Sequence, residues 1–143
     1  MIEKAIIVMS AYNAEKTLNK VYSKIPKKLV SDIILVDDCS RDTTYQISEK
    51  LGLKTFVHKM NMGYGANQKT CYEEALKLKG DFIISLHPDD QYDPKDILKF
   101  IDKFNHSDAD IIFGSRFLSS GGNKTPLYKS ISIKVIQCYI TYC

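Results

Sequence analysis

Short apolar runs alternate with segments of helical periodicity along this chain, and the alternation restricts the fold more than any other feature. The apolar runs are residues 5–9, 33–36, 55–57, 82–86 and 111–113. Continuous runs of this length are typical of strands buried on both faces of a parallel sheet. Between them, apolar residues recur every three or four positions, which predicts helices. This order predicts a three-layer α/β fold, in which helices cover both faces of a mainly parallel sheet.

Residues that commonly start or stop helices lie between the first apolar runs. Asn13 is expected to cap a helix that ends at Pro26. Ser40 or Asp42 is expected to cap a second helix, with Gly52 as its C-terminal stop.

Two further helices are predicted in the second half of the chain. One covers residues 66–78, and the other begins where Asp93 precedes Pro94, a cap followed by proline at the first turn. Residues 1–118 are then expected to form the core domain, and residues 119–143 a loop and the start of a helix.

Charge and cysteine content exclude several classes of protein. The formal net charge is +3, from 20 Lys and Arg against 17 Asp and Glu, without a dense basic tract, so nucleic acid is not an expected partner. The four cysteines form no CxxC pair, which favours reduced thiols and a cytoplasmic location. No stretch reaches the ~20 apolar residues that span a bilayer. The apolar tail from Ile131 could lie on the cytoplasmic face of a membrane or form a homodimer.

Candidate ligand-binding residues follow the first two predicted strands. In a parallel sheet, ligands bind beyond the carboxyl ends of the strands. Tyr12 could stack its ring on a nucleobase, or it could cover the edge of the sheet. Asp37 and Asp38 could each accept a hydrogen bond from a base or a ribose, or cap the next helix.

Oxygen-bearing side chains gather after the fourth predicted strand. Asp89, Asp90 and Gln91 are hard ligands of the kind that Mg²⁺ or Mn²⁺ prefers. Asp93, in the same segment, is well placed to cap a helix. Arg116 follows the fifth predicted strand and could contact a phosphate or form a surface ion pair.

A glycine-containing turn precedes the third predicted helix at residues 61–66. Gln68 stands where a dinucleotide-binding fingerprint has its third glycine, so a tight turn is the preferred interpretation and a dehydrogenase is disfavoured. Residues 10–13 lack the glycine-rich loop and arginine of a nucleotidyltransferase, which disfavours that class.

Five motifs in order resemble those of family 2 glycosyltransferases, most closely the dolichyl-phosphate or polyprenyl-phosphate sugar transferase branch. The resemblance covers roughly residues 5–135 and implies a Rossmann-like GT-A fold. The motifs are Ala11-Tyr12-Asn13, Val36-Asp37-Asp38-Cys39-Ser40-Arg41-Asp42-Thr43, Asn61-Met62-Gly63-Tyr64-Gly65, His87-Pro88-Asp89-Asp90-Gln91-Tyr92-Asp93-Pro94 and Gly114-Ser115-Arg116-Phe117.

The resemblance implies a donor site for a UDP- or GDP-sugar. Tyr12 would stack on the base, beside Ala11 and Gly63. Asp38, together with Asp37, would hold the base or the ribose.

The resemblance also implies a metal-assisted reaction. Asp89 would hold Mg²⁺ or Mn²⁺ between the two phosphates, with Gln91 and His87 as further ligands and Asp90 as a substrate contact. Arg116 would meet the phosphate of the donor or of a lipid-phosphate acceptor. The metal stabilises the charge on the leaving diphosphate, and inversion at the sugar carbon is a single displacement.

Several residues depart from the family pattern. His87 replaces the first aspartate of Asp-x-Asp, and Cys39 replaces a glycine. Tyr128 and Lys129 stand where the branch has Trp-Arg, so Lys129 keeps the charge of a substrate contact without the forked geometry of arginine. The chain is also expected to stop before the acceptor-binding region is complete. A domain that binds nucleotide-sugar without turnover is therefore the alternative to an active transferase.

Overall fold

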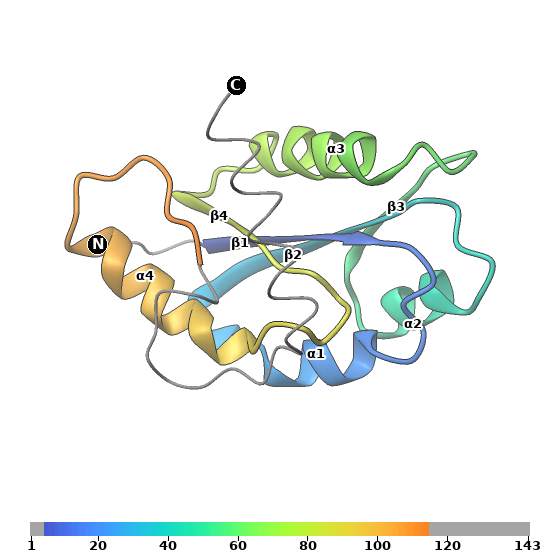
Figure 1. The fold of residues 1–143 in the computed structure, drawn as a ribbon, viewed down its shortest axis with the longest axis horizontal. Coiled ribbons are helices and arrows are strands. Elements are labelled where there is room, and N and C mark those ends of the chain that lie inside the picture. The colour runs from blue at the N-terminus through green and yellow to red at the C-terminus, as the bar shows by residue number, and fades with distance from the viewer. Residues whose placement is uncertain (1–4, 115–143) are drawn as a thin grey trace, which may run out of the picture. The chain divides into compact units, whose positions relative to one another are not determined.

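The computed structural model describes residues 5–114, and these contain a four-stranded sheet in which all paired strands run parallel (Figure 1). The strand order is β3-β2-β1-β4. In the central strand, Ile7 lies opposite Ile33 of β2 and Ile84 of β4. The strands are β1 (Ala5–Ala11), β2 (Val30–Asp37), β3 (Lys54–Val57) and β4 (Phe82–Ser85).

Four α-helices connect or follow these strands and cover the sheet on both faces. Figure 1 shows α3 on one side of the sheet and α1, α2 and α4 on the other, which confirms the predicted three layers. No helix within residues 5–114 is long and apolar enough to cross a membrane. The α-helices are α1 (Leu18–Lys24), α2 (Thr44–Lys50), α3 (Tyr64–Leu76) and α4 (Ile97–Asn105), and short 3-10 helices cover Lys27–Leu29 and Pro94–Asp96.

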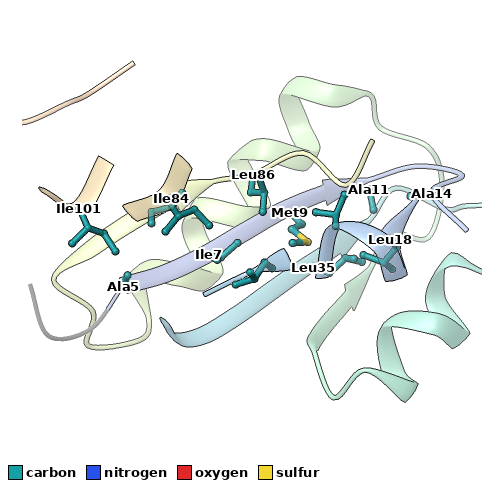
Figure 2. Close-up of a cluster of buried hydrophobic side chains, with 13 residues drawn as sticks. Ala5, Ile7, Met9, Ala11, Ala14, Leu18, Leu35, Ile84, Leu86 and Ile101 are labelled. Carbon is teal, nitrogen blue, oxygen red and sulfur yellow. The ribbon is translucent and has the colours of Figure 1, made fainter. Parts of the chain in front are cut away.

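The continuous apolar run of β1 has a simple explanation, because both of its faces are buried. Ile7 and Met9 pack with Leu18 of α1 and Ile101 of α4 in the larger hydrophobic cluster (Figure 2). The alternate residues of β1 pack against α3, where Cys71 contributes to a second cluster. A strand buried on both sides has no polar face, which is why its sequence does not alternate.

The predicted fifth strand, residues 111–113, is wrong. Residues 111–114 have no regular secondary structure, and within the described residues the sheet ends at β4. A strand forms only where its backbone N–H and C=O groups find a partner, and three apolar residues cannot specify that partner. The chain divides into compact units at residues 1–110 and 111–143, and every described helix and strand belongs to the first.

The predicted cap at Asn13 is also wrong, because α1 begins only at Leu18. Asn13 instead adopts a left-handed conformation, with φ of 51°. Its backbone N–H donates to Ser40 Oγ at 2.8 Å, and its side-chain oxygen accepts the Arg41 N–H at 2.9 Å. Asn13 therefore joins the loops that follow β1 and β2, the two loops that carry the first predicted ligand contacts.

Other helix boundaries agree more closely with the sequence. Asp42 accepts the N–H of Thr44, the first residue of α2. Gly52 ends that helix with φ of +71°, as a C-terminal glycine should. Asp93 accepts the Lys95 N–H, which confirms its capping role. The third helix begins at Tyr64 and ends at Leu76, two residues before the predicted boundary at each end.

Candidate functional site

Two neighbouring hollows open beyond the carboxyl ends of β1, β2 and β4, and Ser10 and Tyr12 line both. We call them the Asp38 hollow, of about 190 Å³, and the Asp89 hollow, of about 230 Å³. The Asp38 hollow is lined by Ser10, Ala11, Tyr12, Asp38, Asn61, Gly63, Tyr64 and Asn67. The Asp89 hollow is lined by Ser10, Tyr12, Asn13, Ala14, Thr17, His87, Pro88 and Asp89.

Two tyrosines provide aromatic surface at these hollows. Tyr12 is 48% exposed, so its ring is accessible to a ligand from the hollows that it lines. Tyr64 was not singled out in the sequence. It lies at the start of α3 and stacks on His87, with ring centroids 5.4 Å apart and 3.1 Å between Tyr64 Oη and His87 Nε2. This contact connects the lining of one hollow to the lining of the other.

Asp38 is a buried carboxylate with three donors. Its Oδ1 accepts from His58 Nδ1 at 2.7 Å and from the Met62 N–H at 2.9 Å, and its Oδ2 accepts the Gly63 N–H at 2.8 Å. Burial acts to raise the pKa of Asp38, but the N–H groups of Met62, His58 and Gly63 together hold it below its ordinary value. Asp38 therefore lines its hollow as an ionised acceptor and also holds the loop that forms the opposite wall.

Asp37 behaves differently from its neighbour. Its carboxylate accepts the Ser40 hydroxyl and, at 3.3 Å, the Ser40 N–H. It is 2% exposed and lines neither hollow, and burial raises its pKa. This arrangement matches the alternative interpretation of Asp37, an aspartate that caps the turn before α2, rather than a contact to a base or a ribose.

The loop after β4 places His87 and Asp89 in the lining of the Asp89 hollow. Gln91 is exposed and lines neither hollow, although its backbone N–H donates to Asp89 Oδ1 at 3.1 Å. Both oxygens of Asp90 are engaged, one with Lys20 and the other with Lys24 of α1 at 2.8 Å. Asp89, Asp90 and Gln91 thus have different surroundings in the structure, although the sequence analysis considered all three as oxygen ligands for a metal.

The residues present fit a divalent cation only in part. Within residues 5–114, no group of three His, Cys, Asp or Glu side chains lies close enough to enclose one. Mg²⁺ commonly takes one or two carboxylates and completes its shell with water and phosphate oxygens. Asp89, exposed at the hollow, fits that use, whereas His87 Nε2 is engaged with Tyr64.

If Asp89 holds Mn²⁺, as the resemblance implies, replacing Lys20 and Lys24 together with methionine is expected to weaken that binding about three-fold. The two lysines hold Asp90, and Asp90 has φ of 58°, so its ion pairs fix the loop that carries Asp89. The change is measured by titrating Mn²⁺ in the presence of a nucleoside diphosphate. Because the loss of two positive charges by itself favours a cation, weaker binding would be due to the loss of loop order, whereas stronger binding would contradict a role of these ion pairs in fixing the loop.

Asn67, His58 and Thr70 are polar residues at the site that the sequence analysis also missed. Asn67, buried on α3, donates to the carbonyl oxygens of Ala11 at 3.2 Å and Val36 at 3.0 Å. It thereby ties the ends of β1 and β2 to α3. Its position four residues before the buried Cys71 was a usable signal, because it places an amide on the apolar face of the helix. His58 and Thr70, by contrast, had no signal in the sequence.

Arg116 and Lys129 lie outside the described residues, so their roles stay predictions. Ala11, at the end of β1, and Gly63, before α3, lie together in the lining of the Asp38 hollow with Tyr12. The structure therefore brings together most of the residues expected near a base in the Asp38 hollow. His87 and Asp89, expected near a metal, line the Asp89 hollow, and Tyr12 lines both.

The profile described as glycosyl transferase family 2 matches residues 6–137. The chain belongs to this family. A relative from Methanocaldococcus jannaschii, an uncharacterised protein, is 32% identical over 141 residues, which are 98% of this chain and 58% of that protein. UDP-N-acetylglucosamine–dolichyl-phosphate N-acetylglucosaminyltransferase of Methanococcus voltae is 28% identical over 150 residues, which are 92% of this chain and 60% of that enzyme. The chain thus spans less than two thirds of either relative.

Solved structures show the same fold. The 1–349 fragment of Staphylococcus aureus TarS in complex with UDP has a TM-score of 0.57 and 27% identity, covering 71% of this chain and 33% of that one. The same fragment in complex with UDP-GlcNAc has a TM-score of 0.54 and 28% identity, covering 71% and 32%. Together with the parallel sheet, this likeness confirms the GT-A fold expected of a family 2 glycosyltransferase.

Proposed function

We propose that this family 2 domain transfers a sugar from a UDP- or GDP-sugar to a polyprenyl or dolichyl phosphate. Family membership and the nucleotide complexes of TarS support the donor class. The M. voltae relative, whose name includes dolichyl phosphate, supports the acceptor class.

The observation that carries the proposal is the pair of hollows that share Tyr12. The Asp38 hollow offers an aromatic ring and an ionised acceptor, which suit a base with its N–H groups. The Asp89 hollow offers an exposed carboxylate, which suits a cation held between protein and phosphates. A nucleoside diphosphate has its base and its phosphates joined by a ribose, and two adjoining hollows match that division.

The residues would act by binding and orientation. Tyr12 would hold the base, and Asp89, with His87 or Gln91, would hold Mg²⁺ or Mn²⁺, which supplies a positive charge to the leaving diphosphate. Arg116 and Lys129 would contact phosphate groups. A lipid phosphate is already an anion, so it can attack the sugar carbon with inversion without a general base to remove a proton.

The alternative function is a domain that binds nucleotide-sugar without turnover. His87 favours it, because an imidazole engaged with Tyr64 stands at the first position of the Asp-x-Asp motif. Contact of the tail with a membrane, or dimerisation through it, remains a further prediction for either function.

The test is calorimetric titration of the full chain with UDP, GDP and CDP, each with Mn²⁺ and with EDTA. We expect one of UDP or GDP to bind at micromolar concentration with Mn²⁺ and at least about ten-fold more weakly with EDTA. Asp102→Asn is the matched control, since Asp102 is an exposed residue of α4 that lines neither hollow. A folded protein that binds none of the three contradicts the proposal.

A second assay separates the two functions. Release of the diphosphate from a bound nucleotide-sugar is followed with and without a polyprenyl phosphate. Acceptor-dependent release is expected of a transferase. Donor binding without release supports the binding domain.

A further inference from the structure

His58 links three elements at the Asp38 hollow through its side chain and its backbone. Its ring contacts Asp38 Oδ1 through Nδ1 at 2.7 Å and Thr70 Oγ1 through Nε2 at 3.0 Å. Its backbone N–H donates to the Asp37 carbonyl at 2.9 Å, one residue beyond the end of β3. The side chain therefore joins the end of β2 to α3, while the backbone extends the pairing of β3 with β2.

Asp38 connects this side chain to the wall of the hollow. The carboxylate that accepts from His58 also accepts the N–H groups of Met62 and Gly63. Gly63 has φ of 86° and precedes the first residue of α3, so the chain turns sharply at the point that Asp38 holds. Asn61, Gly63 and Tyr64, which line the hollow, lie within or next to this turn.

The tautomer of His58 follows from its partner. An ionised carboxylate only accepts hydrogen bonds, so Nδ1 must carry the proton that it shares with Asp38. Within residues 5–114, no other side chain donates to Asp38, and the His58 side chain is 11% exposed, so water has little access to replace it. The ring of His58 is thus one of three donors that fix the orientation of the Asp38 carboxylate, together with the N–H groups of Met62 and Gly63.

We propose that His58 is a positioning residue for nucleoside binding: by donating Nδ1–H to Asp38 it orients the carboxylate that holds residues 61–64 as the wall of the Asp38 hollow. The inference rests on the proposed function, because that function places the nucleoside in this hollow. His58 lines neither hollow, so it acts through Asp38 and not by touching the ligand.

Two substitutions separate the two ring contacts. In His58→Asn, the amide nitrogen can occupy the place of Nδ1 and donate to Asp38, but the side chain is too short to reach Thr70. In His58→Gln, the amide reaches the place of Nε2 near Thr70 and leaves Asp38 without its donor. We expect UDP or GDP affinity to stay within about three-fold of wild type in His58→Asn and to fall about ten-fold in His58→Gln.

A second measurement does not need the ligand. In the free protein, NMR is used to compare the hydrogen exchange of the Met62 and Gly63 amides, which Asp38 accepts. We expect these amides to be protected in wild type and in His58→Asn, and to exchange about ten-fold faster in His58→Gln. Thr70→Val removes the other ring contact, together with the bond from the Thr70 hydroxyl to the Ala66 carbonyl within α3, and is expected to match His58→Asn.

The outcomes distinguish this inference from the proposed function. If wild type binds no nucleoside diphosphate, the proposed function fails, and amide exchange still decides the role of His58. If His58→Asn and His58→Gln change nucleotide affinity and amide exchange equally, the positioning role of His58 is overturned. If His58→Gln does not fold, His58→Asn decides, since a ten-fold loss of affinity or of amide protection in that variant overturns it.

Discussion

Asp89→Ala is expected to remove the Mn²⁺-dependent part of nucleoside diphosphate binding and to slow donor turnover by about 100-fold or more. Asp89 is the one carboxylate in the described lining of its hollow, and it is exposed there. Without it, a cation between protein and diphosphate loses its anionic protein ligand. Calorimetry with Mn²⁺ and with EDTA, followed by a turnover assay, measures both effects.

Two other variants show whether the effect is specific to Asp89. Asp102→Asn should leave binding unchanged, because that residue lies on α4 outside both hollows. His87→Ala should have a smaller effect than Asp89→Ala, since His87 Nε2 is already engaged with Tyr64. Unaltered metal dependence in Asp89→Ala would remove Asp89 from the metal site.

The sequence predicts the sheet well because a strand that is buried on both faces is apolar at successive positions. Residues 5–9 could not be apolar throughout on a strand with a solvated face, and the structure buries them completely. The same argument fails at residues 111–113. An apolar run records a tendency to be buried, but the hydrogen-bonding partner that makes a strand is not encoded in the run itself.

The sequence could predict which segments form the site, but it could not predict which side chains of those segments line the hollows. Asp89 and Asp90 are adjacent and chemically identical, yet Asp89 lines a hollow and Asp90 binds two lysines of α1. Those lysines lie 66 and 70 positions away in the sequence, so no local pattern could pair them with Asp90. His58 was missed for the same reason, since its role depends on contacts with Asp38 and Thr70.

Asp38→Ala is expected to lower the free energy of unfolding by about 3 kcal/mol. The substitution leaves the His58 ring and the N–H groups of Met62 and Gly63 without their acceptor in a buried place. Unfolding by urea measures the change. Glu73→Ala, on the exposed side of α3, is the control and should change stability little.

The free energy of unfolding of wild type relative to Asp38→Asn should change with pH in one direction, and that relative to Asp37→Asn in the other. The pKa of Asp38 lies below its ordinary value of 3.8, so its stabilising contribution is present above pH 3.8 and is lost as pH falls through the folded-state pKa. The pKa of Asp37 lies above 3.8 because of burial, so stability is lost as pH rises from 3.8 through its folded-state pKa.

Urea unfolding of each variant and of wild type across this range measures both differences. As pH falls toward and below 4, wild type should lose its advantage over Asp38→Asn and gain relative to Asp37→Asn. The opposite signs follow from the opposite surroundings of two adjacent carboxylates. The Asp38 carboxylate is held by three donors, whereas the hydrogen bonds that Ser40 gives the Asp37 carboxylate do not outweigh its burial. If wild type instead gained relative to Asp38→Asn as pH falls, Asp38 would not be held ionised by His58 and the loop, and the basis for its role in the hollow would be removed.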